Sequence, residues 1–281
     1  MMQSLSNWCI LTGTWIGLNW QTLIDKPSEN PGNWDQALIT FLGSNENKTT
    51  NLCSEHWVHK PEHFHIQQTE SWDCGIACLM MIQRWLREHR PNSTGNTSLD
   101  ELNDRDWILK LVNTESIWSI DLVYVLEQLR KTKKLNFRYL FASKVLEVDQ
   151  HHKNLSYYEK AFSDDQTRVT QLFQKAQRES WPLIKLEGQL NLAQVASLVS
   201  RPDCVAIALV DNMILMQKGE SSTYAGHYII ISGVYRDSEN CDTFQIHNPD
   251  SLRPLDHISF PIFEKAWRAQ GTDEDIIFLI A

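Results

Sequence analysis

The sequence predicts an α+β protein, with helices in the N-terminal half of one large domain and an antiparallel sheet in the C-terminal half. Apolar residues recur at helical spacing before residue 200, whereas short β-branched or apolar runs bounded by turn residues are concentrated after it. Strands and helices do not alternate strictly, as they would in a doubly wound or dinucleotide-binding sheet. The segregated order therefore favours the α+β class.

The helical period is clearest where Ala77, Met81 and Trp85 recur every fourth residue. Other segments before residue 200 show similar apolar repeats. The predicted helices are Gly75 to Glu88, Ser119 to Arg130, Ser163 to Glu179 and Leu190 to Leu198.

The strands are predicted from short apolar runs that end at turn residues. These runs are Cys204 to Val210, His227 to Ser232, Thr243 to Ile246 and Ile276 to Ile280. The run after His227 does not alternate apolar with polar residues, so we expect this strand to be buried on both faces.

The composition is that of a soluble globular protein: 281 residues, 42% hydrophobic and 22% charged, long enough to bury a core without disulfides. Much of residues 1–62 mixes Pro, Gly, Asn and Ser with charge, which predicts an irregular or flexible N-terminal extension. Residues 63–281 are expected to form the compact domain. The polar stretch from Arg90 to Asn103 is expected to be a surface loop within it.

Charge and cysteine usage narrow the class of protein. A net charge of -9 without a basic stripe argues against nucleic-acid binding. The apolar run from Trp8 to Leu18 lacks a basic start and is too short to span a bilayer, so no membrane association is expected. Six cysteines without regular spacing favour a reducing compartment, the cytoplasm or the nucleus.

Cys74 is the first candidate for chemistry, because it stands at the predicted start of a helix, after Asp73, which could cap that helix. The helix dipole there would lower the thiol pKa, and Gly75 leaves space beside the sulfur. Gln68 lies where its amide could stabilise an oxyanion, together with the backbone N–H of Cys74. The plainer alternative is a buried, inert cysteine, the role that we expect for Cys78 one turn further on.

A histidine and an asparagine complete the candidate site. His227 begins an apolar strand, which is a rigid support for a general base. The next strand runs into Asn248, and antiparallel pairing of the two strands would bring Asn248 to His227. Asn248 would then hold the imidazole in the tautomer that leaves one nitrogen for Cys74, unless Asn248-Pro249 is simply a turn.

These motifs, Gln68, Asp73-Cys-Gly-x-Ala-Cys78, Gly226-His-Tyr228 and Asn248-Pro249 in this order, resemble the site of papain-like cysteine peptidases, most closely the bacteriocin-processing branch. Three other segments resemble the guanylyl cyclase domain-containing family of animals and plants, over about residues 64 to 281. They are Glu115 to Leu122, Thr167 to Phe173, and Ala266 to Phe278. Plant members have Asp-Pro where this chain has Asn248-Pro249, and either residue can orient a histidine.

The two resemblances imply different activities. The first implies a papain-like fold and a thiol hydrolase, a peptidase, isopeptidase or amidase, that acts on a peptide or protein through Cys74, His227, Asn248 and Gln68. The second implies, through the family's name, a guanylyl cyclase that converts GTP to cyclic GMP. A third hypothesis is an interaction module that has kept the fold but has no catalytic activity.

Cofactors are not expected for the hydrolase, whereas the cyclase would need Mg or Mn. Asp273, Glu274 and Asp275 could hold a metal, but we expect an acidic turn of this kind to be solvated. The chain has no Gly-x-x-x-x-Gly-Lys-Ser/Thr loop for phosphates. We also expect the histidines at His63-Phe-His65 and His151-His152 to be exposed side chains and not metal ligands.

Overall fold

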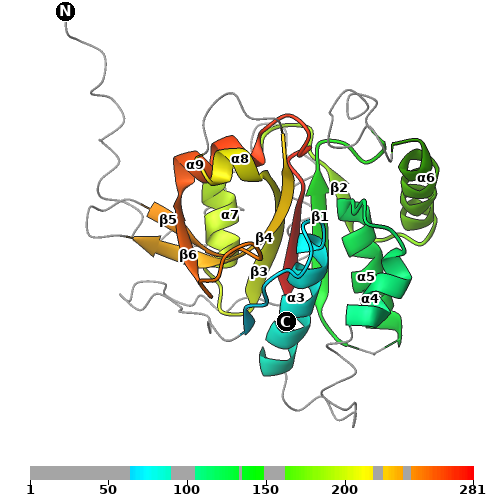
Figure 1. The fold of residues 1–281 in the computed structure, drawn as a ribbon, viewed down its shortest axis with the longest axis horizontal. Coiled ribbons are helices and arrows are strands. Elements are labelled where there is room, and N and C mark those ends of the chain that lie inside the picture. The colour runs from blue at the N-terminus through cyan, green and yellow to red at the C-terminus, as the bar shows by residue number, and fades with distance from the viewer. Residues whose placement is uncertain (1–63, 90–104, 133–134, 149–161, 218–223, 237–241) are drawn as a thin grey trace, which may run out of the picture. The chain divides into compact units, whose positions relative to one another are not determined.

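The computed structural model describes residues 64–89, 105–132, 135–148, 162–217, 224–236 and 242–281 (Figure 1). By its internal contacts the chain divides into Met1–Trp57 and Val58–Ala281, and all described residues belong to the second unit. The predicted N-terminal extension and the whole of the predicted loop at 90–103 lie outside the described residues.

The elements of the described unit follow the predicted order of helices and then strands in outline, but two strands lie among the helices and two helices lie among the strands. The helices are α3 (Cys74–His89), α4 (Arg105–Val112), α5 (Ser119–Thr132), α6 (Phe162–Arg178), α7 (Leu192–Val199), α8 (Asn212–Leu215) and α9 (Phe260–Trp267). The strands are β1 (Arg138–Ser143), β2 (Leu183–Lys185), β3 (Cys204–Asp211), β4 (Gly226–Arg236), β5 (Asp242–His247), β6 (Asp256–Ser259) and β7 (Ile276–Ile280).

One seven-stranded sheet joins all the described strands in the order β2-β1-β7-β3-β4-β5-β6 (Figure 1). Only the pair of β1 with β2 is parallel, and every other neighbouring pair is antiparallel. The α+β class is therefore confirmed, and the sheet is mostly antiparallel. The last strand of the chain, β7, lies inside the sheet between β1 and β3.

The core covers both faces of the central strands. All eight residues of β3 are buried, and its alternate residues Val205, Ile207 and Leu209 belong to the same apolar cluster as α3 and α5. Helices α7 and α9 also pack on β3 (Figure 1). The residues of β4 from His227 to Ser232 are likewise buried, as its lack of alternation predicts. Strand β4 is therefore a rigid support for side chains at its beginning.

The four predicted helices and four predicted strands are all present, with ends that differ by a few residues. Elements without a strong pattern, β1, β2, β6, α4, α8 and α9, are additions. Strand β2 has only three residues and β6 only four, too few to establish a period. Within the described ranges, none of the helices combines the length and the apolar character needed to cross a membrane.

Candidate active site

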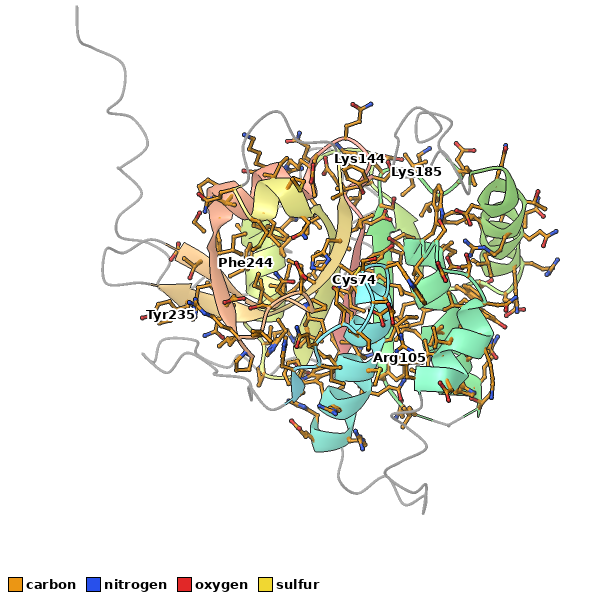
Figure 2. All side chains as sticks on the ribbon, in the orientation of Figure 1. Cys74, Arg105, Lys144, Lys185, Tyr235 and Phe244 are labelled. Atoms are coloured by element: carbon orange, nitrogen blue, oxygen red, sulfur yellow. The ribbon has the colours of Figure 1, made fainter. Side chains whose placement is uncertain are left out.

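Cys74 is the first residue of α3, at the end of the helix that meets the sheet (Figure 2). The first helical hydrogen bond runs from the backbone N–H of Ala77 to the carbonyl of Asp73. The backbone N–H of Tyr228, on β4, donates to Cys74 Sγ at 3.5 Å. The side chain of Cys74 is 5% exposed. The sulfur therefore lies between the start of a helix and the start of a strand that is 154 residues away in the chain.

Gly75 makes this close approach possible. A Cβ at this position would lie 3.0 Å from Leu122 Cδ2 and 3.1 Å from Tyr228 Cδ2. Real Cβ atoms are almost never closer to another atom than the first of these distances. A larger residue would require Leu122 and Tyr228 to move by a few tenths of an ångström, so glycine has a packing role here.

Burial determines the protonation of Cys74. Loss of solvent, together with the nearby charge of Asp73, raises the thiol pKa to about 11. Backbone N–H groups of Tyr228, Gly75 and Cys74 itself act in the opposite direction but do not offset burial. The expectation of a lowered pKa is therefore wrong for this state of the protein, because desolvation outweighs the dipole of the helix.

His227 and Asn248 meet as predicted. Strands β4 and β5 are antiparallel, and His227 Nε2 lies 2.7 Å from Asn248 Oδ1. The same oxygen accepts from the backbone N–H of Asp250 at 3.0 Å, which establishes that the amide oxygen, and not its nitrogen, faces the histidine. An amide oxygen only accepts, so Nε2 carries the proton and Nδ1 of the neutral ring is an acceptor.

The imidazole is a neutral base in this environment. Burial lowers the pKa of His227, while the hydrogen bond to Asn248 and the charge of Asp250 act in the opposite direction. The side chains of His227 and Asn248 are 4% and 3% exposed. Burial therefore favours the neutral thiol of Cys74 and the neutral imidazole of His227 over their charged forms.

Gln68 is hydrogen-bonded to the residue that follows Asn248. Its backbone N–H donates to the carbonyl of Pro249, next to Asn248, at 2.9 Å. Its side-chain Nε2 donates to the carbonyl of Glu70 at 2.9 Å. Only one of the two Nε2 hydrogens is needed for this bond, which leaves the second for a ligand.

The four predicted residues thus lie in one neighbourhood, connected by backbone and side-chain hydrogen bonds. Cys78 is fully buried, and burial raises its pKa, in agreement with its predicted structural role. His65 is partly buried against the carbonyl of Ser251, so the expectation that it is exposed is wrong. His63, His151 and His152 lie outside the described residues.

Asp73 does not cap α3 with its side chain, contrary to the prediction. Its Oδ1 accepts from the backbone N–H groups of Thr69 and Glu70 at 3.1 and 3.0 Å, and its Oδ2 accepts from Arg105 Nη2 at 2.5 Å. Sequence reasoning missed Arg105, which is 32 residues away and belongs to a helix that the sequence pattern did not predict.

The first residue of α5 contacts the site through Tyr228, whose hydroxyl lies 3.1 Å from Ser119 Oγ. Asp121 accepts from the backbone N–H of Trp118 at 2.8 Å and is paired with Arg168, which also binds Asp165. Burial raises the pKa of Asp121 to about 6.

A cleft of about 440 Å³ lies between α4, α5 and α6. Arg168 and Asp121 line it, together with Tyr124, Lys175 and Arg178. Lys175 Nζ is 4.6 Å from the centre of the Tyr124 ring. The cleft thus combines aromatic, apolar and cationic side chains.

The acidic turn at residues 273–275 does not fit a divalent cation. Glu274 is buried and its carboxylate is paired with Lys144 and with Arg268, the latter at 2.7 Å. The expectation of a solvated turn is also wrong for Glu274, because two cations compensate its burial. In the part of the chain that the structure describes, no three metal-ligating side chains are grouped together.

Fold and geometry define an α+β protein with a buried cysteine beside a histidine–asparagine pair. Comparison with known families identifies the family of the chain. A family model described as "Guanylylate cyclase" matches residues 64–279, and the chain belongs to this family. It is similar to "Guanylyl cyclase 1" of Arabidopsis thaliana, with 28% identity over 226 residues, 76% of this chain and 74% of the relative. The resemblance to papain-like peptidases gains no support from these comparisons and depends on the site alone.

Proposed function

We propose that this protein is a papain-like, cysteine-dependent hydrolase in which Cys74 is the nucleophile, His227 the general base and Asn248 the residue that orients the base. One observation carries the proposal: His227 Nε2 is bound to Asn248 Oδ1 while the next residue, Tyr228, contacts Cys74 Sγ. The fold agrees with a papain-like arrangement in having the cysteine at a helix start and the histidine on an antiparallel strand.

The proposed reaction starts from the neutral pair. As Cys74 Sγ bonds to the acyl carbon, its proton passes to His227 Nδ1, and the carbonyl electrons move to oxygen. The second Nε2 hydrogen of Gln68 and the backbone N–H of Cys74 stabilise that oxyanion. Collapse of the adduct expels the leaving amine, which takes the proton from His227. Water then attacks the thioester, with His227 again accepting a proton, and releases the acid and the free thiol.

Substrates of this chemistry contain an amide, as in a peptide, an isopeptide or a small amide. All share the thioester, so the residues at the centre of the site do not distinguish them. We propose a peptide or protein substrate by analogy with the papain-like peptidases.

The first test is the intact mass of wild type and Cys74→Ala after brief treatment with iodoacetamide across a pH series. Because burial raises the pKa of Cys74 to about 11, we expect alkylation at Cys74 to rise with pH through the alkaline range, without a plateau below pH 8. Each pH unit below the pKa reduces the thiolate about tenfold. A plateau below pH 8 would instead indicate a preformed ion pair.

The hydrolase proposal itself is tested with an activated acyl ester, 4-nitrophenyl acetate. We expect acetyl transfer to Cys74 in wild type, no transfer in Cys74→Ala, and strongly slowed transfer in His227→Ala. Equal acetylation of wild type and Cys74→Ala would rule out Cys74 as the nucleophile.

The second candidate function is guanylyl cyclase, and the family description favours it. The cleft between α4, α5 and α6 supports it, because Lys175 and Arg178 could meet a triphosphate and Tyr124 could contact a base. GTP turnover to cyclic GMP should then be measured with Mg or Mn. A cyclase that uses this cleft would keep its activity in Cys74→Ala and lose it in the double variant Lys175→Glu, Arg178→Glu. If neither activity is found, the interaction module becomes the better proposal.

A further inference from the structure

We propose that Asp73 and Arg105 are positioning residues of the oxyanion site, which act through the segment that carries Gln68. The inference rests on the proposed hydrolase function and adds a pair of residues to it. The pair links the start of α4 to the loop before Cys74 (Figure 2).

Asp73 connects two parts of the site. Its backbone carbonyl accepts the first hydrogen bond of α3, from Ala77, at 3.0 Å. Its carboxylate accepts the N–H groups of Thr69 and Glu70 with one oxygen and Arg105 with the other. The loop before the nucleophile is therefore tied to the helix that presents the nucleophile.

Glu70 passes this constraint on to Gln68. The N–H of Glu70 is held by Asp73, and its carbonyl accepts Gln68 Nε2 at 2.9 Å. The backbone N–H of Gln68 is held by Pro249, beside Asn248. Since both its backbone and its amide are tethered, the remaining Nε2 hydrogen has a defined direction. An oxyanion donor contributes only when it is preorganised in this way.

Arg105 is the ion-pair partner of the Asp73 carboxylate. The side chain of Asp73 is 2% exposed, whereas that of Arg105 is 31% exposed. An unpaired carboxylate is costly to bury, so loss of Arg105 would favour displacement of the Asp73 side chain from its place in the loop. The charge of Asp73 also disfavours the thiolate of its neighbour Cys74. The carboxylate of Asp73 thus disfavours ionisation of the Cys74 thiol, but it holds the loop that carries Gln68 in place.

Two reagents distinguish stabilisation of the oxyanion from reactivity of the Cys74 thiol. Acetyl transfer from 4-nitrophenyl acetate passes through a tetrahedral oxyanion, with 4-nitrophenolate as leaving group. Alkylation by iodoacetamide displaces iodide at a saturated carbon and forms no oxyanion. The ratio of the two rates at Cys74, measured by intact mass at one pH, reports the oxyanion site separately from thiol reactivity.

We expect Arg105→Ala to lower this ratio about tenfold, less than the loss of an entire donor, while alkylation stays close to that of wild type. Arg105→Lys should restore part of the ratio, since it restores the charge. Gln68→Ala should lower the ratio more, and adding Arg105→Ala to it should have little further effect.

The matched control is Arg130→Ala, which removes an arginine from another surface ion pair. Arg130 is 42% exposed and its partner Glu127 only 6% exposed, much as in the pair of Arg105 and Asp73. This variant should leave the ratio unchanged. Urea unfolding of each variant shows whether it is folded.

Three outcomes would overturn the inference. An unchanged ratio in Arg105→Ala, with wild type acetylated at Cys74, would refute the positioning role and leave the hydrolase proposal intact. An equal fall of both rates would indicate a merely structural role. If wild type is alkylated but never acetylated at Cys74, the hydrolase proposal fails before any variant is compared, and the positioning role fails with it.

Discussion

The oxygen that faces His227 belongs to a neutral amide, and this determines how readily the imidazole takes a proton. Asn248 Oδ1 is shared between His227 Nε2 and the backbone N–H of Asp250, so the orientation of the amide is set by two donors. A carboxylate in the same place could accept both bonds while adding a full negative charge 2.7 Å from the ring. Either an amide or a carboxylate at position 248 can orient the imidazole of His227, but only a carboxylate would also raise its proton affinity.

Replacing Asn248 by Asp should raise the pKa of His227, by about one unit or more, because a carboxylate stabilises the imidazolium. A protonated ring cannot act as base, so the rising limb of acetyl transfer with pH should move to higher pH. The measurement is the pH profile of acetylation, together with an NMR titration of the His227 ring. Asn248→Ala is the control, because it removes the orienting oxygen without adding charge. An identical profile in wild type and Asn248→Asp would contradict the proposed role of His227 as base.

At the same scale, the proximity of the four site residues could be read from the sequence, but their ionisation could not. Cys74 and His227 each stood in a recognisable motif, and antiparallel pairing of β4 with β5 placed Asn248. Arg105 carried no such signal, because it contacts Asp73 only through the packing of two helices. The raised pKa of Cys74 depends on how much solvent the assembled core excludes, which no local pattern reports.

Helix α3 approaches α5 and β4 closely enough that its second residue must be small. We expect Gly75→Ala to destabilise the protein by about 1 kcal/mol, because the overpacking cost at 3.0 Å from Leu122 exceeds the gain in helix propensity. Urea unfolding gives the change in free energy. Gly188→Ala is the matched control, since a Cβ there would meet nothing within 4 Å. A more stable Gly75→Ala variant would mean that α3 can shift without cost.

Elements with a long apolar period were predictable, and those defined by their neighbours were not. Helix α3 and strand β7 have strong patterns and were located correctly. Strand β2 has three residues and is a strand only because β1 pairs with it. Pairing with a neighbouring strand thus defines the short strands that local residue propensity does not predict.

For the molecule as a whole, the described core begins at Phe64. This side chain is fully buried, and its ring lies 4.1 Å from that of His247. The family match also begins at residue 64. We therefore propose that residues 63–281 are sufficient to form the domain.

A chain of residues 63–281 should unfold at the same urea concentration as the full chain. A chain that begins at residue 66 is the control, because it also lacks Phe64 and should lose roughly 3 kcal/mol or more, as for other deletions of a buried Phe. Urea unfolding followed by tryptophan fluorescence makes the comparison. A large loss in the 63–281 chain would show that earlier residues contribute to the fold.

The place of β7 in the sheet has a consequence for how the protein folds. Among the described strands, β1 and β2 form one part of the sheet and β3 to β6 form another, and β7 is hydrogen-bonded to both parts. Until β7 is in place, β1 and β3 each have an unpaired edge, the feature that makes partly folded chains prone to aggregate. Because β7 is far from β1 in the sequence, we expect its insertion to be a slow step of folding.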